Sequence, residues 1–236
     1  MDVLADLADA GLVPEARYPR PEFERLANLV VDRFEHAGRT TFIFPEEARL
    51  LFALAHQVRP RNAVFLGSYY GYWAIWAAPA VLASGGRMTL VDVDADAMAT
   101  ARSNMAALGF ADSVDFVVAD AIDFAQHQLR DVDLCVLDAE GPKEGPVPDL
   151  LDKAIYFPIT QAVTPALLPN ALLVAHNVLL QNLTANAYFA GRIEHNRAQF
   201  GKWMTHLTEH YNVHRVYPSS EGTGVYRKLG SPCAGW

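Results

Sequence analysis

The sequence predicts an α/β fold built on a doubly wound sheet, mostly parallel with an antiparallel last strand, and preceded by an N-terminal helical extension. From about residue 62, short apolar runs alternate with longer stretches whose apolar residues recur at helical spacing. The apolar runs lack polar alternation, which is typical of parallel strands covered by helices on both faces. Two further runs near the end of the chain look like a closing pair of strands around the polar stretch SSEGT.

The elements follow one another in the order that such a sheet requires. Five apolar runs are predicted as strands, at residues 63–66, 87–93, 114–118, 133–138 and 171–178, and the closing pair lies at 213–218 and 224–228. Helices are predicted at about 72–82, 95–108, 122–129, 150–168 and 187–210, with two more within residues 1–40. Ligands of open α/β sheets bind outside the carboxyl ends of the strands. Polar or glycine residues gather at those ends, namely Gly67, Asp92, Asp120, Asp138 and His176.

Length and charge restrict the class of protein. The 236 residues suit one domain at 41–230, preceded by a segment at 1–40 that serves as a helical cap or a dimer contact. The net charge of −8, without a run of Lys or Arg, disfavours a nucleic-acid partner. No apolar stretch approaches the roughly 18 residues of a membrane span, and the acidic N-terminus does not resemble a signal peptide. We therefore expect a cytoplasmic enzyme that acts on small molecules, either as a monomer or as a homodimer.

The first predicted strand ends in the turn FLGSYYGYW. Gly67 and Gly71 are four positions apart, which differs from the G-x-G-x-x-G turn that binds dinucleotides. The pyrophosphate of a dinucleotide needs bare backbone at the position that Tyr69 occupies here. A phenol ring leaves no room for phosphate, but it can lie beside a cofactor that has none. The turn therefore favours S-adenosylmethionine over a nicotinamide dinucleotide.

Two acids complete the predicted cofactor site. Asp92 ends the second strand, 25 positions after Gly67, where a carboxylate can accept both ribose hydroxyls. Asp120 ends the third strand and is placed to meet the adenine edge. A single Asp after a strand usually caps a helix or closes a turn. The glycine turn and the two acids on consecutive strand ends together favour a cofactor site.

Four motifs resemble those of the catechol and caffeoyl-CoA type O-methyltransferases, a family of small class I methyltransferases. LGSYYGYW is similar to the family's LGxYxGYS, VDVD to IEID, VLDAEG to IDADK and LLVAHNVL to LLVADNVL, and the similarity runs from about residue 44 to 228. The resemblance implies a Rossmann-like domain that binds S-adenosylmethionine and carries an antiparallel last strand.

The resemblance also implies the residues of the acceptor site. Asp138, His176 and Asn177 match positions that bind a magnesium ion, which holds two substrate oxygens; Asp138 also lies beside the cofactor, and Glu221 matches an acid that touches the substrate. Magnesium prefers an octahedral shell of oxygen ligands. Because His176 replaces a carboxylate, a divalent metal is not established, and a softer ion would suit the imidazole better.

Other departures affect individual contacts. Phe65 replaces the family's Glu before the glycine turn, and Gly141 stands where the family has a lysine, with Lys143 two residues later. We predict that His176 removes the acceptor's proton, assisted by Asp138 and Lys143. The alternative is a buried histidine that is hydrogen-bonded to the sheet edge. Trp73 lines either the substrate pocket or the core.

These observations predict an O-methyltransferase that uses S-adenosylmethionine on a phenolic or catechol-like molecule of secondary metabolism. A second hypothesis keeps the cofactor but transfers the methyl group to nitrogen or carbon, or transfers none, with His176 acting without a metal. A third is a non-catalytic binding module or a nicotinamide-dependent oxidoreductase, against which Tyr69 argues.

Overall fold

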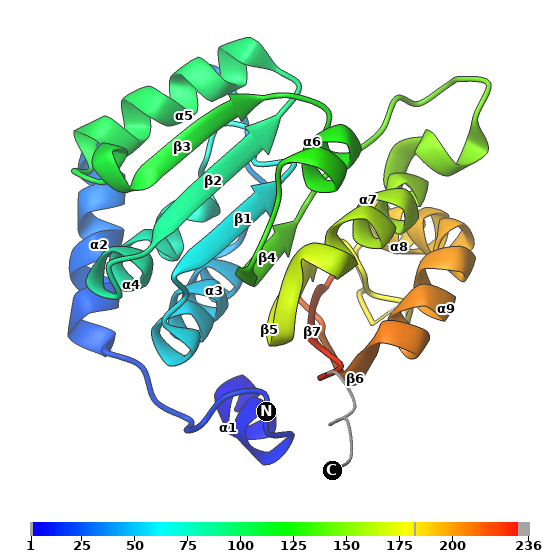
Figure 1. Cartoon of the computed structure of the whole chain (residues 1–236), viewed down its shortest axis with the longest axis horizontal. Coiled ribbons are helices and arrows are strands. Elements are labelled where there is room, and N and C mark those ends of the chain that lie inside the picture. Colours follow the sequence, from blue (N-terminus) through cyan, green and yellow to red (C-terminus); the bar gives the residue numbers. More distant parts are fainter. Residues whose placement is uncertain (1, 182, 231–236) are drawn as a thin grey trace. The chain divides into compact units, whose positions relative to one another are not determined.

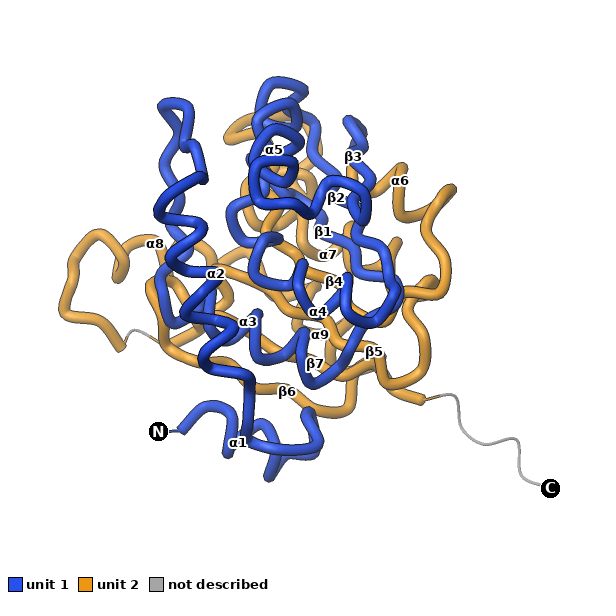
Figure 2. The backbone as a smooth tube through the Cα atoms, turned by 90° about the vertical axis from the view of Figure 1, so that its left-hand side faces the viewer, with its two compact units in different colours: residues 1–120 blue, residues 121–236 orange. Residues whose placement is uncertain are grey.

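The computed structural model describes residues 2–181 and 183–230. The chain divides into two compact units, residues 1–120 (unit 1) and residues 121–236 (unit 2), which Figure 2 shows in two colours. Each unit contains both strands and helices.

Unit 1 is a parallel three-stranded arrangement with strand order β3-β2-β1 (Figure 1). Helical elements follow β1 and β2, with α4 packed against β2 and α5 packed against β2 and β3. Its elements are α1 (Val3–Asp9), α2 (Arg20–Arg33), α3 (Pro45–Val58), β1 (Asn62–Leu66), η1 (Ala74–Trp76), α4 (Ala78–Ala83), β2 (Arg87–Asp92), α5 (Ala95–Ala107), η2 (Ala111–Ser113) and β3 (Val114–Val118).

The N-terminal segment folds onto the rest of unit 1. Helix α1 contacts α3, and Asn104 of α5 binds the main chain after α2 through two hydrogen bonds. Its Oδ1 accepts from the N–H of Glu35 at 2.9 Å, and its Nδ2 donates to the carbonyl of Glu35 at 3.0 Å. Because Asn104 is buried, its polar atoms need these partners within the protein.

Unit 2 has the strand order β4-β5-β7-β6. Strands β4 and β5 are parallel, whereas β7 is antiparallel to both β5 and β6 (Figure 1). Its elements are α6 (Ala121–His127), β4 (Val132–Leu137), η3 (Pro148–Leu150), η4 (Asp152–Ile155), α7 (Tyr156–Val163), η5 (Thr164–Ala166), β5 (Leu167–His176), α8 (Ala187–Gln199), α9 (Gly201–His210), β6 (Tyr211–Tyr217) and β7 (Thr223–Lys228).

Two predicted helices of unit 2 differ from the structure. The helix predicted at 187–210 is divided at Phe200, whose buried ring packs against Tyr156 and Trp203 instead of continuing the polar face. The helix predicted at 150–168 is reduced to α7 between short 3₁₀ turns. Tertiary packing of aromatic side chains determines the first difference, which helical periodicity alone does not reveal.

None of the helices in the described part of the chain is both long and apolar enough to span a membrane.

Candidate functional site

The glycine turn of unit 1 follows β1 and depends on left-handed backbone. Gly67 and Gly71 have φ of +78° and +83°. A Cβ at Gly71 would also lie 3.2 Å from the Cβ of Ala101, so this glycine lets the turn approach α5 closely. Tyr69 has φ of +48°, which is costly for a bulky residue and is common at functional sites. Tyr69 is 42% exposed, and the centre of its ring lies 5.9 Å from the guanidinium carbon of Arg39.

Asp92 is bound directly to this turn. Its Oδ2 accepts a hydrogen bond from the main-chain N–H of Tyr69 at 2.7 Å, and its Oδ1 accepts from the N–H of Asp94 at 3.0 Å. Burial raises the pKa of the Asp92 carboxyl, and these main-chain hydrogen bonds oppose that rise. The glycine turn and Asp92, the acid predicted to bind ribose, are therefore held together by a direct hydrogen bond.

Asp120 and Trp73 take different places in unit 1. Asp120 is exposed just beyond β3, next to Ala119, whose N–H donates to the carbonyl of Asp92 at 3.0 Å. Trp73 is only 6% exposed, and its indole N–H donates to the carbonyl of Glu47 at 3.4 Å. Of the two places predicted for Trp73, the structure supports the core, and its contact with a substrate stays a prediction.

A second group of polar residues gathers in unit 2 at the ends of β4 and β5. The Oδ2 of Asp138 lies 3.4 Å from the Nδ1 of His176, and its Oδ1 accepts a hydrogen bond from the Nζ of Lys153 at 3.2 Å. The hydroxyl of Tyr156 donates to the carbonyl of His176 at 2.8 Å. These side chains form a continuous chain of contacts, in which Asp138 joins a histidine to a lysine.

The electrostatics of this group favour an ionised Asp138. Burial raises the pKa of the Asp138 carboxyl, but the charges of His176 and Lys153 and their hydrogen bonds outweigh it, so the net effect lowers that pKa. The side chain of His176 is 2% exposed, and its Nε2 lies 3.5 Å from the hydroxyl of Ser220. With the proton of a neutral imidazole on Nδ1, facing Asp138, Nε2 is the nitrogen that can accept another.

The lysine beside Asp138 is Lys153, which the sequence reasoning missed. Lys143, the lysine predicted for catalysis, is exposed and paired with Glu140 and with Asp152 at 3.3 Å. Among the described residues, Lys143 pairs with these two carboxylates, and its catalytic role stays a prediction. The sequence does carry one hint of Lys153. The charged pair Asp152-Lys153 stands directly before the strongly apolar stretch that contains Tyr156.

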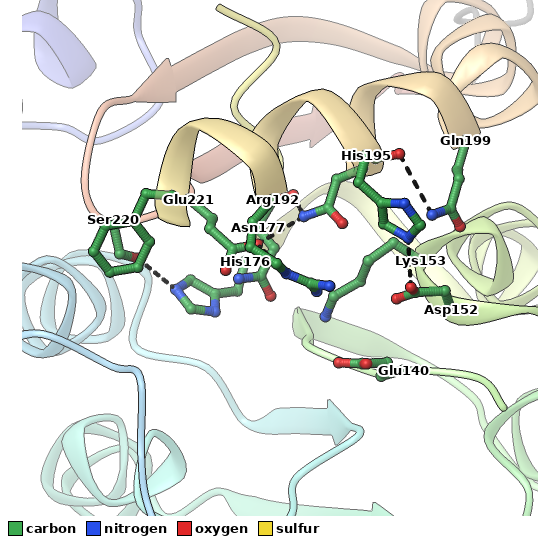
Figure 3. A network of polar contacts seen from close by, with 12 residues as sticks. Glu140, Asp152, Lys153, His176, Asn177, Arg192, His195, Gln199, Ser220 and Glu221 are labelled. Atoms are coloured by element: carbon green, nitrogen blue, oxygen red, sulfur yellow. Dashed lines mark hydrogen bonds and ion pairs between the residues drawn. The ribbon is translucent and has the colours of Figure 1, made fainter. Parts of the chain in front are cut away.

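Helix α8 supplies a polar face that the sequence also did not reveal (Figure 3). The amide of Asn196 donates to Oε2 of Glu221 at 2.8 Å and to the carbonyl of Asn177 at 3.4 Å. The Nε of Arg192 lies 3.6 Å from Oε2 of Glu221. Glu221 and Asn177, both predicted to contact substrate, are therefore held by the same helix, and Asn177 has φ of +58°.

Asp152 combines a left-handed backbone with a buried carboxylate. It has φ of +45°, its side chain is 8% exposed, and its Oδ2 accepts from the Nε2 of His195 at 2.7 Å. Its buried Oδ1 makes no hydrogen bond. Burial raises the pKa of Asp152, but hydrogen bonds from His195 and Lys143 and the charge of Arg192 lower it overall. Figure 3 shows Asp152, His195 and Gln199 at one end of the network.

The residues of unit 2 do not fit a magnesium ion. Among the described residues, no group of three or more His, Cys, Asp or Glu side chains is arranged to hold a metal. Of the three implied ligands, only Asp138 is a carboxylate, and both of its oxygens already face Lys153 or His176. A hard divalent cation needs several oxygen ligands and would lie beside a buried ammonium.

Residues 64–178 match the family model described as a methyltransferase domain. These residues form a methyltransferase domain. It begins within β1, includes the glycine turn and Asp92 of unit 1, and extends through Asp138 and His176 of unit 2 to the residue after Asn177. The predicted resemblance to methyltransferases, and the prediction of an enzyme, are confirmed.

Solved methyltransferase structures share the fold over most of the chain. A methyltransferase of Podospora anserina, bound to S-adenosylhomocysteine, has a TM-score of 0.66 at 16% identity and covers 87% of each chain. An O-methyltransferase of Bacillus cereus, in complex with S-adenosylhomocysteine, has a TM-score of 0.60 at 16% identity, over 87% of this chain and 90% of the other. The O-methyltransferase TomG of Streptomyces achromogenes, in complex with S-adenosylmethionine, has a TM-score of 0.60 at 18% identity, over 88% and 89%.

These structures confirm the predicted fold class, a Rossmann-like and mostly parallel sheet with an antiparallel last strand. No curated protein is similar enough in sequence to count as a match.

Proposed function

We propose that this methyltransferase transfers the methyl group of S-adenosylmethionine to a hydroxyl of a phenolic or catechol-like small molecule. The observation that carries the proposal is the 2.7 Å hydrogen bond between the N–H of Tyr69 and Asp92. It joins a turn without room for phosphate to a carboxylate suited to ribose hydroxyls. The three structures described above carry S-adenosylmethionine or its demethylated product, which supports the same cofactor here.

The residues of unit 1 suit this cofactor. Asp92 keeps acceptor capacity beyond its two main-chain hydrogen bonds, since an ionised carboxylate has about four lone-pair sites. The exposed ring of Tyr69 offers an apolar face beside the turn, and Asp120 is accessible for the adenine edge. When bound, the sulfonium of the cofactor supplies a methyl group with a good leaving group.

We assign proton removal to His176, oriented by Asp138. A phenol has a pKa near 10, so at neutral pH its proton must leave as the oxygen forms its bond to the methyl carbon. Nε2 of His176 accepts that proton, while Asp138 holds Nδ1 and stabilises the resulting imidazolium. Glu221 and Asn177 are proposed to position the acceptor, and Asp138 is proposed to border the cofactor as well.

The proposed metabolic role and location rest on the sequence and on one similar structure. TomG is described as involved in tomaymycin synthesis, which supports a role in secondary metabolism. The acidic chain favours small-molecule substrates over nucleic acid. We place the enzyme in the cytoplasm, away from membranes. We also propose that residues 1–40 form a cap or a homodimer contact and that residues 41–230 form the catalytic domain.

The test is a transfer assay with S-adenosylmethionine and a panel of phenols and catechols. We expect S-adenosylhomocysteine to be released and the acceptor to gain one methylene in mass, with the new methyl group on oxygen by NMR. A methyl group on nitrogen or carbon would support the second hypothesis. Thermal stabilisation by NAD and not by S-adenosylhomocysteine would contradict the proposal.

A further inference from the structure

We propose that the ammonium of Lys153 takes the place of a divalent metal in this enzyme, as the positive partner of Asp138 and a positioning residue for His176. The inference rests on the proposed function for its catalytic part. Its structural part, that the native site excludes a divalent cation because Lys153 is there, is independent of any reaction.

Lys153 has the environment of a built-in cation. Its side chain is only 3% exposed, and its Nζ has three acceptors: Oδ1 of Asp138 at 3.2 Å, the carbonyl of Ala139 at 3.0 Å and the hydroxyl of Tyr156 at 3.3 Å. An ammonium has three protons, so every donor has a partner. The Nζ also lies 5.1 Å from the centre of the Tyr156 ring. A charged lysine is almost never buried unless it is paired in this way.

The charge count explains the exclusion of a metal. Asp138 contributes one negative charge and Lys153 one positive charge, whereas the amide of Asn177, and the imidazole of His176 in the neutral form that a metal would require, contribute none. The group is therefore balanced without a further ion. A divalent cation at Asp138 would have to displace Lys153 or lie beside its buried ammonium, and it would meet one carboxylate in place of the several oxygen ligands that it prefers.

The same contacts position the histidine. Lys153 occupies Oδ1 of Asp138, which leaves Oδ2 facing Nδ1 of His176 at 3.4 Å. Tyr156 contacts Lys153 and also donates to the main-chain carbonyl of His176 at 2.8 Å. Figure 3 shows Lys153 reaching into the network that contains His176. Lys153 thus fixes both the charge and the rotamer of the carboxylate that orients His176.

The first experiment measures binding of Mn²⁺ alone, by electron paramagnetic resonance, to the full chain. We expect no stoichiometric binding to the wild type or to Lys143→Met, the matched control for an exposed lysine of the same segment. Lys153→Met should gain one site per chain with at least tenfold higher affinity, and the additional change Asp138→Asn should abolish it. Lys153→Gln, which keeps a donor to Asp138 and Ala139, serves as a second variant if Lys153→Met does not fold.

Two results would overturn the proposal. One is stoichiometric Mn²⁺ binding by the wild type that Asp138→Asn removes. The other is a folded Lys153 variant, verified by circular dichroism, that gains no Mn²⁺ site. Neither readout depends on methyl transfer, so failure of the proposed function remains distinguishable.

The second experiment tests positioning once an acceptor is found. Wild-type transfer should be unchanged in chelator. Lys153→Gln should lower kcat by at least tenfold with an unchanged KM for S-adenosylmethionine, and Mn²⁺ should restore part of the loss. A merely structural lysine would give no such metal rescue, and its absence in a folded variant would contradict the positioning role.

Discussion

The glycine turn of unit 1 and the polar network of unit 2 are assembled in different ways. The turn is fixed by its main chain, which donates hydrogen bonds from Gly67 and Ser68 to the carbonyl of Val91 and from Tyr69 to Asp92, 23 positions away. The network consists of side chains that meet across separations of 15 positions for Lys153 and Asp138 and 43 positions for His195 and Asp152. A backbone turn needs glycines at fixed spacing, whereas a side-chain network can draw its members from any element that folds over it.

This difference explains why the two regions tolerate change differently. In the turn, a substitution at a glycine with positive φ strains the backbone itself. In the network, the backbone survives but a buried charge loses its partner, which costs more than the net value of the bond.

His176→Ala should lower the transfer rate by about 10²–10⁴-fold, because it removes the proposed proton acceptor. Affinity for S-adenosylhomocysteine, measured by calorimetry, should change little, since the cofactor residues of unit 1 are untouched. A variant with normal turnover would reduce His176 to a buried residue of the sheet edge. This is the strongest test that catalysis belongs to the network.

Asp92→Ala should weaken binding of S-adenosylhomocysteine by about 5- to 150-fold, the equivalent of 1–3 kcal/mol for ribose hydroxyls left without an acceptor. Calorimetry measures the change directly. Glu144→Ala, in the exposed loop after β4, is a control that should bind normally. Unchanged affinity in Asp92→Ala would remove the cofactor from this turn.

The pH dependence of cofactor binding should follow Asp92. Burial raises its pKa, so the carboxylate becomes protonated at a higher pH than an ordinary aspartate and then accepts fewer hydrogen bonds. Cofactor affinity should fall as the pH is lowered through this pKa, and Asp92→Asn should lack that fall.

Lowering the pH should weaken cofactor binding through Asp92, but it should raise the contribution of Asp92 to the free energy of unfolding. A carboxyl whose pKa is higher in the folded state than in the unfolded state destabilises the fold fully above the folded-state pKa; this penalty fades as the pH falls and disappears below the unfolded-state pKa. Denaturant unfolding of the wild type and of Asp92→Asn between pH 7 and pH 4 would measure the difference. A wild type that loses stability relative to Asp92→Asn as the pH falls would contradict this assignment.

The smallest effect is expected for His195→Ala, which leaves buried Asp152 with Lys143 as its remaining close partner. Because His195 is 53% exposed, we expect a loss of only about 1 kcal/mol in the free energy of unfolding at neutral pH. His127→Ala breaks a pair with Asp123 in which both side chains are exposed, and should cost less. Equal effects would show that the burial of Asp152 adds nothing.

The parts of the molecule that follow from local pattern were predicted well. The five parallel-type strands and the closing pair were found because apolar runs and turn residues mark them within a few residues. The strand ends also led to Asp92, Asp138 and His176, since the edge of a parallel sheet collects such residues. The places of these residues follow from one simple rule of topology.

The remainder depended on contacts that no local pattern encodes. Lys153 and Asn196 look like ordinary polar residues of helical segments, and only tertiary packing brings them to Asp138 and Glu221. Trp73 shows the converse, because a large aromatic residue beside the cofactor turn became part of the core. Residues at the ends of strands could therefore be predicted as neighbours, whereas Lys153 and Asn196, which helical segments bring in by tertiary packing, could not.

The loop between Gly141 and Asp152 closes on itself. The N–H of Gly141 donates to the carbonyl of Asp152 at 2.9 Å, and the N–H of Asp152 donates to the carbonyl of Pro142 at 3.1 Å. Gly141 is needed there because a Cβ would lie 1.9 Å from the carbonyl oxygen of Leu150. Such a loop can change length at its exposed tip for little entropy, since doubling a flexible loop costs only about 0.6 kcal/mol. The exposed tip can therefore change in length during evolution without breaking the hydrogen bonds at the base of the loop.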